Sequence, residues 1–310
     1  MTDDTRLHFR SVTFKALEPG PRLIVLGAVH GNETCGARAI TRVLGDLESG
    51  RLSLRAGTVT FVPVTNPLAY AKGTRSGDRN LNRRLRPTDD VREFEDHVAN
   101  WLCPLLAQHE VLLDLHSMRA GADPFALVGP RNNTGPIEPF AHEERERALV
   151  RRLGVKRFVE GWLSTYARGV ERRGNGDFNY GVGTTEYMRS VGGYAITLEC
   201  GQHESKSAPE VAYRAIRNTL AYLGLSDDPL VPAVQDHETL KIVDVIDRDH
   251  ERDQFCREWS SFDAVASGQL IATRADGTAV TAPFDGVILF PDAGAEPGHE
   301  WFYLAQPGTL

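Results

Sequence analysis

Two histidines and two glutamates lie at the ends of apolar segments, where a sheet could bring them together. His30 and Glu33 follow the first segment in Gly-Ala-Val-His-Gly-Asn-Glu, His116 ends another in Asp-Leu-His, and Glu199 follows a third. Taken singly, each has an ordinary structural explanation, such as a helix cap or a buried ion pair. Taken together, they favour a hydrolytic metal site, because two imidazoles and one carboxylate with an open fourth position hold catalytic zinc.

A basic segment follows a further apolar run. Residues 72–86 contain six basic side chains, which are Lys72, Arg75, Arg79, Arg83, Arg84 and Arg86. This density is unusual in a chain whose net charge is −7. A solvated loop is one explanation. The other is that the guanidinium groups bind a substrate carboxylate in bidentate geometry and stabilise an oxyanion.

Apolar segments alternate with helical patterns along the first two thirds of the chain. Strands are predicted over residues 22–29, 58–64, 111–115 and 194–198, and helices over residues 40–47, 91–106 and 209–223. This alternation predicts an α/β fold with a mostly parallel or mixed sheet flanked by helices. Ligands bind at the carboxyl ends of strands in such sheets, so the candidate residues are expected to meet at one edge.

The composition changes after residue 225. Residues 226–236 hold two prolines and three aspartates, and short β-like pieces separated by turn residues follow over 240–246, 269–273, 278–281 and 286–290. We predict a catalytic α/β domain over residues 1–225, a linker over 226–236 and a small β domain over 237–310.

Composition and charge limit the partners and the compartment. The 310 residues include 35 Lys and Arg against 42 Asp and Glu, which argues against nucleic acid as the main partner. No apolar run approaches the roughly 18 residues of a membrane span, and the first residues do not resemble a signal peptide. The four scattered cysteines favour a reduced, cytoplasmic protein without disulfides. A homo-oligomer is left open.

Two further stretches have an unusual composition, one rich in charged residues and the other rich in glycine. His142–Arg157 is rich in Glu and Arg and is predicted to be the solvated face of a helix. Arg168–Gly193 is long and Gly-rich, which is typical of a functional lid or a disordered loop, and we expect a lid.

The predicted metal site suits amide hydrolysis. Zinc makes a nucleophile available at neutral pH by acidifying water, and Glu199 could take the proton and deliver it to a leaving amine. Three alternatives remain from the residues alone: a metallocarboxypeptidase, a non-haem iron oxygenase and a protein that only binds an anionic ligand.

The ordered set of motifs resembles the succinylglutamate desuccinylase/aspartoacylase family, which has a zinc-carboxypeptidase-like fold. The similarity covers most of residues 20–225, through Gly27–Glu33, Asn66-Pro67, Gly73–Arg75, Leu81–Arg83, Asp114–His116 and Leu198–Gly201. It implies one zinc ion per chain, held by His30, Glu33 and His116, with Glu199 as the general acid/base. It also implies that the C-terminal β domain is a lipoyl-like barrel.

The same resemblance implies roles for the basic segment. Arg75 is expected to polarise the scissile carbonyl, and Asn82 and Arg83 to hold a substrate carboxylate. Arg189 and Arg119 are also expected to bind substrate. The expected substrate is a small anionic N-acyl amino acid similar to N-succinylglutamate or N-acetylaspartate. The alternative is a zinc metallocarboxypeptidase or esterase acting on another small carboxylate-bearing substrate.

One family feature has no clear counterpart in the sequence. Aspartoacylases send a C-terminal tyrosine into their pocket, but Glu296-Pro297-Gly298 falls near that place here. Tyr303 is a poor substitute by position. This departure argues against N-acetylaspartate without establishing N-succinylglutamate.

Overall fold

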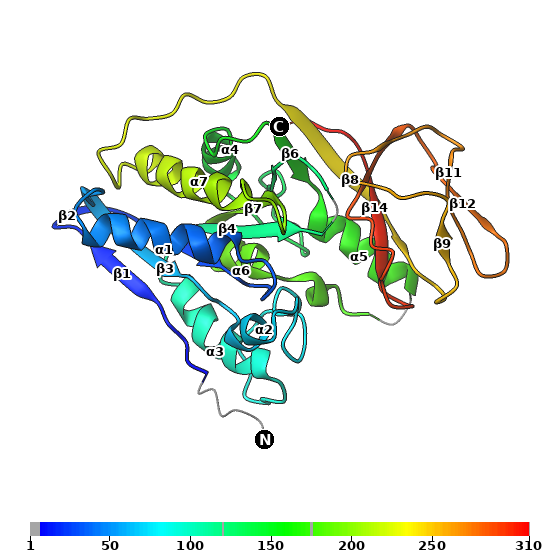
Figure 1. Ribbon diagram of the computed structural model, residues 1–310, viewed down its shortest axis with the longest axis horizontal. Helices are drawn as coiled ribbons and strands as arrows, with labels where there is room; N and C mark the ends of the chain where they lie inside the picture. The colour runs from blue at the N-terminus through cyan, green and yellow to red at the C-terminus, as the bar shows by residue number, and fades with distance from the viewer. Residues whose placement is uncertain (1–6, 120, 174–175, 310) are drawn as a thin grey trace.

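A mixed sheet with helices on both faces forms the body of the molecule (Figure 1). The structure is a computed structural model that describes residues 7–119, 121–173 and 176–309. Its strands are β1 (Val12–Lys15), β2 (Glu18–Gly27), β3 (Ala56–Val62), β4 (Val111–Met118), β5 (Phe125–Leu127), β6 (Arg157–Glu160), β7 (Tyr194–Gln202), β8 (Glu238–Asp247), β9 (Gln254–Phe255), β10 (Ala264–Val265), β11 (Leu270–Thr273), β12 (Ala279–Thr281), β13 (Gly286–Leu289) and β14 (Glu300–Pro307). Its helices are α1 (Cys35–Glu48), α2 (Pro67–Lys72), α3 (Phe94–Leu106), α4 (Glu143–Val150), α5 (Trp162–Arg173), α6 (Thr184–Ser190) and α7 (Ala208–Tyr222), with a 3-10 turn η1 (Phe178–Gly181).

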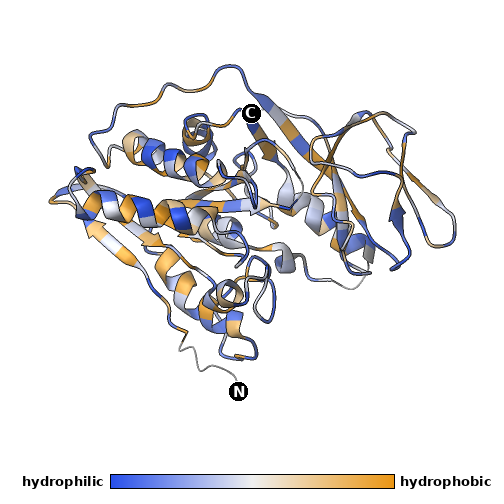
Figure 2. Cartoon of the chain, in the orientation of Figure 1, coloured by the Kyte–Doolittle hydropathy of each residue, from blue (hydrophilic) through white to orange (hydrophobic). Residues whose placement is uncertain are grey.

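Four parallel strands, in the order β3-β2-β4-β7, form the centre of the sheet. Along β2, Leu23 and Val25 join the core beneath α1 and α7, whereas Ile24 and Leu26 join the core beneath α3. Because both faces of β4, β7 and the second half of β2 are covered, these sequences are mostly apolar runs, whereas β3 alternates Thr58 and Thr60 with Val59 and Phe61. Figure 2 shows many hydrophobic residues on α1, on α3 and on the strands between them. The predicted fold class and the four predicted strands are therefore confirmed.

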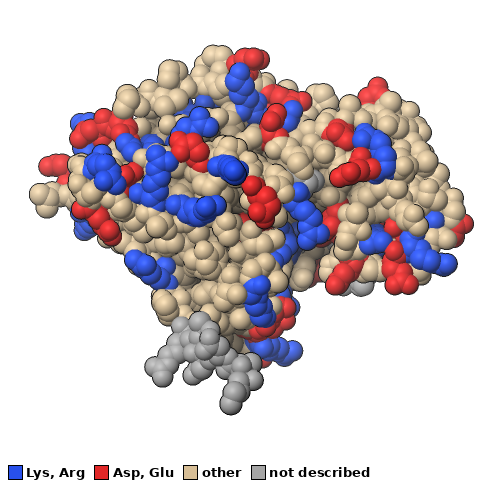
Figure 3. Space-filling view, viewed as in Figure 1, with Lys and Arg blue, Asp and Glu red and all other residues tan. Residues whose placement is uncertain are grey.

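Helix α1 illustrates why the helical predictions hold. Ile40, Val43 and Leu44 recur at helical spacing and are buried against the sheet. On the outer face, Arg42 pairs with Glu210 of α7, its Nη1 2.6 Å from the Glu210 carboxylate. Figure 3 shows basic and acidic side chains intermingled over α1 and α7. The helices predicted over 91–106 and 209–223 correspond to α3 and α7.

The C-terminal strands extend the same sheet. Strand β8 runs parallel to β6 and antiparallel to β14, and β13 and β10 follow, which gives an eleven-stranded sheet among the described residues. A small antiparallel sheet of β12, β11 and β9 stands beside it. Residues 226–236 hold one isolated bridge and no longer element. The division at 225 and 237 and the lipoyl-like barrel stay predictions.

Two sequence predictions need correction. The helix within His142–Arg157 is α4, but its side chains Glu146 and Arg147 are buried rather than solvated. The stretch Arg168–Gly193 is not a plain loop, because it contains the end of α5, η1 and α6 in its described part.

The cysteines and helices show no sign of disulfides or membrane spans. All four cysteines are free, and only Cys256 is exposed. Across the described ranges, every helix is too short or too polar to cross a membrane.

Candidate functional site

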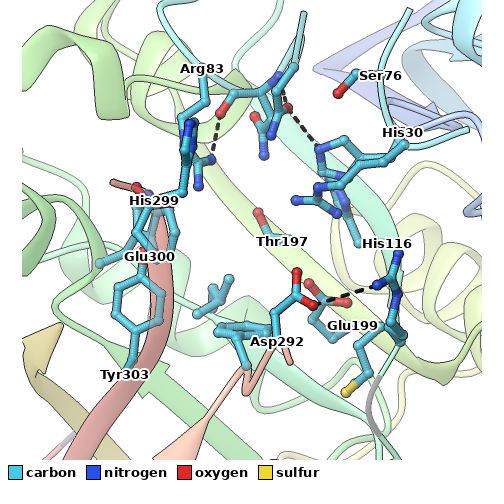
Figure 4. A pocket seen from close by; sticks show the side chains of 18 of the residues that line it. His30, Ser76, Arg83, His116, Thr197, Glu199, Asp292, His299, Glu300 and Tyr303 are labelled. Atoms are coloured by element: carbon cyan, nitrogen blue, oxygen red, sulfur yellow. Dashed lines mark hydrogen bonds and ion pairs between the residues drawn. The ribbon is translucent and has the colours of Figure 1, made fainter. Parts of the chain in front are cut away.

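A cavity of about 670 Å³ opens at the carboxyl edge of the central strands. The predicted site residues that line it are His30, Arg75, Asn82, Arg83, His116, Arg119, Arg189 and Glu199. They come from the turn after β2, the segment after α2, β4, β7 and α6, so segments far apart in the sequence meet here (Figure 4). The expectation that the candidate residues gather at one sheet edge is confirmed.

The turn after β2 aims His30 at the cavity. Ala28 takes a left-handed φ of 48°, a strained conformation for a residue with a side chain. A Cβ at Gly31 would lie 2.0 Å from the carbonyl carbon of Ala69, so only glycine allows α2 to pack this closely. These backbone constraints bring Glu33 back toward His30, and helix α1 starts two residues later.

His30, Glu33 and His116 form a buried triad that could bind a metal ion. One ligand atom from each lies within 4.8 Å of the others. Nδ1 of His30 is 2.8 Å from one carboxylate oxygen of Glu33, and Nδ1 of His116 is 2.9 Å from the other. The two Nδ1 atoms therefore face a shared carboxylate.

The outer nitrogens of both rings are held by oxygen acceptors. Nε2 of His116 lies 2.9 Å from Oδ2 of Asp114, and Nε2 of His30 lies 3.0 Å from Oδ1 of Asn80. Burial and the nearby Arg75 guanidinium lower the pKa of His30 to about 4, so this ring is neutral at pH 7 and has one N–H. One N–H cannot serve two acceptors. A cation between Nδ1 and the carboxylate resolves this mismatch, so the residues present fit a metal ion.

The Asp114→Asn variant is expected to bind metal about 10- to 100-fold more weakly. Asp114 is fully buried, orients His116 and accepts a hydrogen bond from the Thr184 hydroxyl. Competition with a chromogenic chelator measures the zinc affinity. Asp46→Asn is the matched control, since Asp46 is a buried aspartate outside the cavity. Equal affinities for Asp114→Asn and the wild type would remove Asp114 from the metal site.

Glu199 lies beside the triad without a bonding partner for one oxygen. It sits directly across from His116 in the parallel pairing of β4 and β7. Its side chain is buried and lines the cavity, and its Oε2 accepts no hydrogen bond from the residues described. Burial, with a smaller contribution from the charge of Glu33, raises the pKa of Glu199 to about 7. Such a carboxyl group can take and release a proton near neutral pH.

The basic segment supplies two guanidinium groups to the cavity. Nη1 of Arg75 lies 2.8 Å from Oε1 of Glu33, which places Arg75 next to the triad. Arg83 lies over the rings of Trp162 and Tyr166, at 5.0 and 5.6 Å from their centroids. Asn82 lines the cavity, but its Oδ1 accepts the backbone N–H at the start of α6. The substrate roles of these residues stay predictions.

Arg189 and Arg119 occupy less favourable places for substrate binding. Arg189 is buried in an ion network, with Nη1 2.8 Å from Glu138 and Nε 3.1 Å from Glu146. Arg119 is mostly exposed at the rim, 3.5 Å from Asp292. A substrate would have to compete with the carboxylates of Glu138 and Glu146 for Arg189, so this geometry disfavours that prediction.

Replacing Arg189 by Met is expected to lower the free energy of unfolding by about 3–5 kcal/mol. The variant leaves the buried carboxylates of Glu146 and Glu138 without their cation. Urea unfolding of the full chain measures the loss. Arg92→Met is the control, because its ion pair with Asp90 is exposed on both sides and is worth about 1 kcal/mol or less. Equal losses for the two variants would contradict a structural role for Arg189.

The sequence patterns did not identify several residues at the site. Asn80 holds His30, and the pair of Ser117 and His203 lines the cavity with Oγ and Nδ1 2.9 Å apart. Tyr303 also lines the cavity, which its position in the sequence did not indicate. The apolar run 301–305 could have marked a strand there, but not the direction of its side chains.

Comparison with known proteins is consistent with this site. A family model described as the succinylglutamate desuccinylase/aspartoacylase catalytic domain matches residues 19–223, which include the triad and Glu199. No curated protein matches the sequence at a significant level.

Solved structures share the fold at low sequence identity. The product-bound ectoine utilization protein EutE (DoeB) from Ruegeria pomeroyi is 19% identical, with a TM-score of 0.72 over 96% of this chain and 88% of that chain. A succinylglutamate desuccinylase/aspartoacylase from Rhodobacter sphaeroides is 17% identical, with a TM-score of 0.73 over 97% and 90%. An aspartoacylase family protein from Mesorhizobium loti is 20% identical, with a TM-score of 0.66 over 98% and 90%. These similarities establish the fold, and the family model establishes the family: the chain belongs to the succinylglutamate desuccinylase/aspartoacylase family.

Proposed function

We propose that the protein is a zinc-dependent hydrolase that cleaves the amide bond of a small N-acyl amino acid. The observation that carries this proposal is the buried triad with Glu199 beside it at one cavity, where Oε2 of Glu199 has no hydrogen-bond partner among the described residues. Membership of the family supports the hydrolase class, and several neighbours are described as succinylglutamate desuccinylases. The triad of His30, Glu33 and His116 would hold one zinc ion per chain.

We assign each step of the hydrolysis to a residue of the chain. Zinc, when bound, would activate water and polarise the scissile carbonyl. Glu199 accepts the proton of the attacking water and returns it to the leaving amine nitrogen. Arg75, next to Glu33, places positive charge where the oxyanion develops. Arg83 binds a carboxylate of the substrate and thereby fixes the position of the amide.

The rate is expected to fall as the pH drops below about 7, because Glu199 acts as a base only when ionised. Its pKa is raised from 4.5 to about 7, mainly by burial. Since a bound cation favours the ionised carboxylate, the midpoint of this acid limb is expected at or below pH 7. A pH profile of kcat/KM for the wild type measures it. The same limb in the residual activity of Glu199→Gln would assign the titration to another group.

A substrate panel tests the proposed reaction. The zinc-loaded protein is incubated with three classes of substrate, and the release of amine or acid is measured. The classes are N-acyl amino acids (N-succinylglutamate, N-acetylaspartate and neutral N-acetyl amino acids), peptides with a free C-terminus, and the matching esters. Preferential hydrolysis of the N-acyl amino acids is the expected result. Preferential release of C-terminal residues or of alcohols would instead establish a metallocarboxypeptidase or an esterase.

A further inference from the structure

Strand β14 contributes a charged and a phenolic side chain to the end of the cavity that holds Arg83. Glu300 and Tyr303 both line the cavity. In Figure 4 they lie near Arg83, on the opposite side of the view from His30 and Glu199. The cavity therefore has a metal end, which holds His30 and Glu199, and a second end, which holds Arg83, Glu300 and Tyr303.

An irregularity in β14 turns these two side chains toward the same space. Residues three apart in a regular strand point to opposite faces. Here Glu300 and Phe302 pair with consecutive residues of β8, so β14 contains an extra residue at this point. Trp301 and Phe302 pack into the hydrophobic core that the C-terminal strands form. Glu300 and Tyr303 face the cavity. Bulges next to active sites commonly redirect side chains in this way.

Arg83 and Glu300 place opposite charges at this end without neutralising each other. The charge of Glu300 raises the pKa of Arg83, yet Glu300 forms no ion pair among the described residues. Arg83 is instead held over Trp162 and Tyr166. Both charged groups thus remain available to a ligand in the cavity.

Tyr303 supplies an independent indication of a ligand. Its side chain is 3% exposed, and its hydroxyl is buried with no hydrogen-bond partner among the described residues. A buried hydroxyl without a partner is unfavourable, so such groups usually have one. In this cavity, the missing partner would be a polar group of the ligand.

We propose that this end of the cavity binds a free α-amino-acid head group. The substrate carboxylate binds Arg83 and the Tyr303 hydroxyl, and the α-ammonium binds Glu300. The acylated nitrogen then belongs to the side chain of a diamino acid and lies at the metal end. Hydrolysis breaks that amide C–N bond and yields the acyl carboxylate and the free diamino acid. This inference rests on the proposed function and changes the expected substrate from purely anionic to zwitterionic at its head.

Kinetics with matched substrate pairs test the head-group assignment. The pairs are the side-chain N-acetyl derivatives of L-2,4-diaminobutyrate, L-ornithine and L-lysine, each against its analogue without the α-amino group. The wild type is expected to favour the α-amino member of at least one pair by about 10- to 100-fold in kcat/KM. Glu300→Gln should remove this preference, so that the two members of the pair have similar kcat/KM. Glu300→Asp, which keeps the charge, should restore part of it.

Controls separate this proposal from the proposed function. Glu258→Gln, an exposed carboxylate of the C-terminal part outside the cavity, should keep the preference. Hydrolysis of Nα-acyl acidic amino acids with no α-amino preference would overturn the head-group proposal and leave the proposed function standing. L-Glutamine methylated on its side-chain amide nitrogen has the free head group on the acyl side and would release glutamate and methylamine. Its preferred hydrolysis would overturn the diamino-acid assignment.

Binding measurements test the head group without turnover. Calorimetry compares L-ornithine with 5-aminopentanoate, which lacks the α-ammonium, on the wild type and on Glu300→Gln. Tighter binding of L-ornithine to the wild type alone supports the proposal even if no amide is hydrolysed. Equal binding of the two compounds to the wild type would overturn it.

Discussion

Glu199→Gln is expected to lower kcat by about 10²- to 10⁴-fold while zinc content stays at the wild-type level. Glutamine keeps the shape of the side chain but cannot accept the proton of the attacking water. Because Glu199 is not one of the three triad residues, the metal should remain bound. Steady-state amine release measures the rate, and elemental analysis of the same sample measures zinc.

A matched substitution controls for the loss of a carboxylate. Glu210 is exposed on α7 and pairs with Arg42 far from the cavity lining, so Glu210→Gln should retain full turnover. Unchanged turnover in Glu199→Gln would remove Glu199 from the mechanism. A loss of zinc in that variant would instead make Glu199 a metal ligand.

His116→Ala is expected to lose both zinc and turnover. His116 supplies one of three ligand atoms that lie within 4.8 Å of one another, and alanine leaves only His30 and Glu33. The remaining pair lacks the three protein ligands of a catalytic zinc site. Zinc per chain after gel filtration measures the first effect, and amine release measures the second.

A buried histidine elsewhere provides the control. His109 is buried against Thr60 and a backbone carbonyl of α3 and lies outside the cavity lining. His109→Ala should lose stability but keep one zinc ion per chain. Stoichiometric zinc in folded His116→Ala would contradict the ligand assignment.

The gathering of the candidate residues at one edge of the sheet could be predicted, because it follows from the sequence of each strand and from the parallel pairing of the strands. The second half of β2 and strands β4 and β7 are buried on both faces, so each is a mostly apolar run that ends in a polar motif. Parallel strands then bring His116 and Glu199 into direct register without further information. The position of His30 follows from the Ala28 turn, which the sequence shows only as a run of small residues.

The ion network around Arg189 could not be predicted from the same patterns. Helix α4 has acidic and basic residues at intervals typical of a solvated face. Its buried Glu146 pairs with Arg189 and accepts a hydrogen bond from the backbone N–H of Ala195, and both partners are far from it in the chain. Sequence spacing carries no information about such long-range partners.

The far end of the cavity depends on one irregularity in β14. Regular alternation would place Glu300 and Tyr303 on opposite faces, and only the register shift against β8 brings them together. A bulge leaves no periodic signal in an eight-residue strand. For this reason the position of Tyr303 in the sequence does not indicate that it lines the cavity.

Zinc titration of metal-free protein, followed by primary-amine release from N-acyl amino acids, tests the central claim most directly. Amine release is expected to rise in proportion to added zinc and to stop rising at one zinc ion per chain. The triad of His30, Glu33 and His116 is the expected binding site, so His116→Ala should show no rise. Amine release that does not depend on zinc, or zinc-saturated protein that releases amine from no substrate, would contradict a zinc-dependent amide hydrolase.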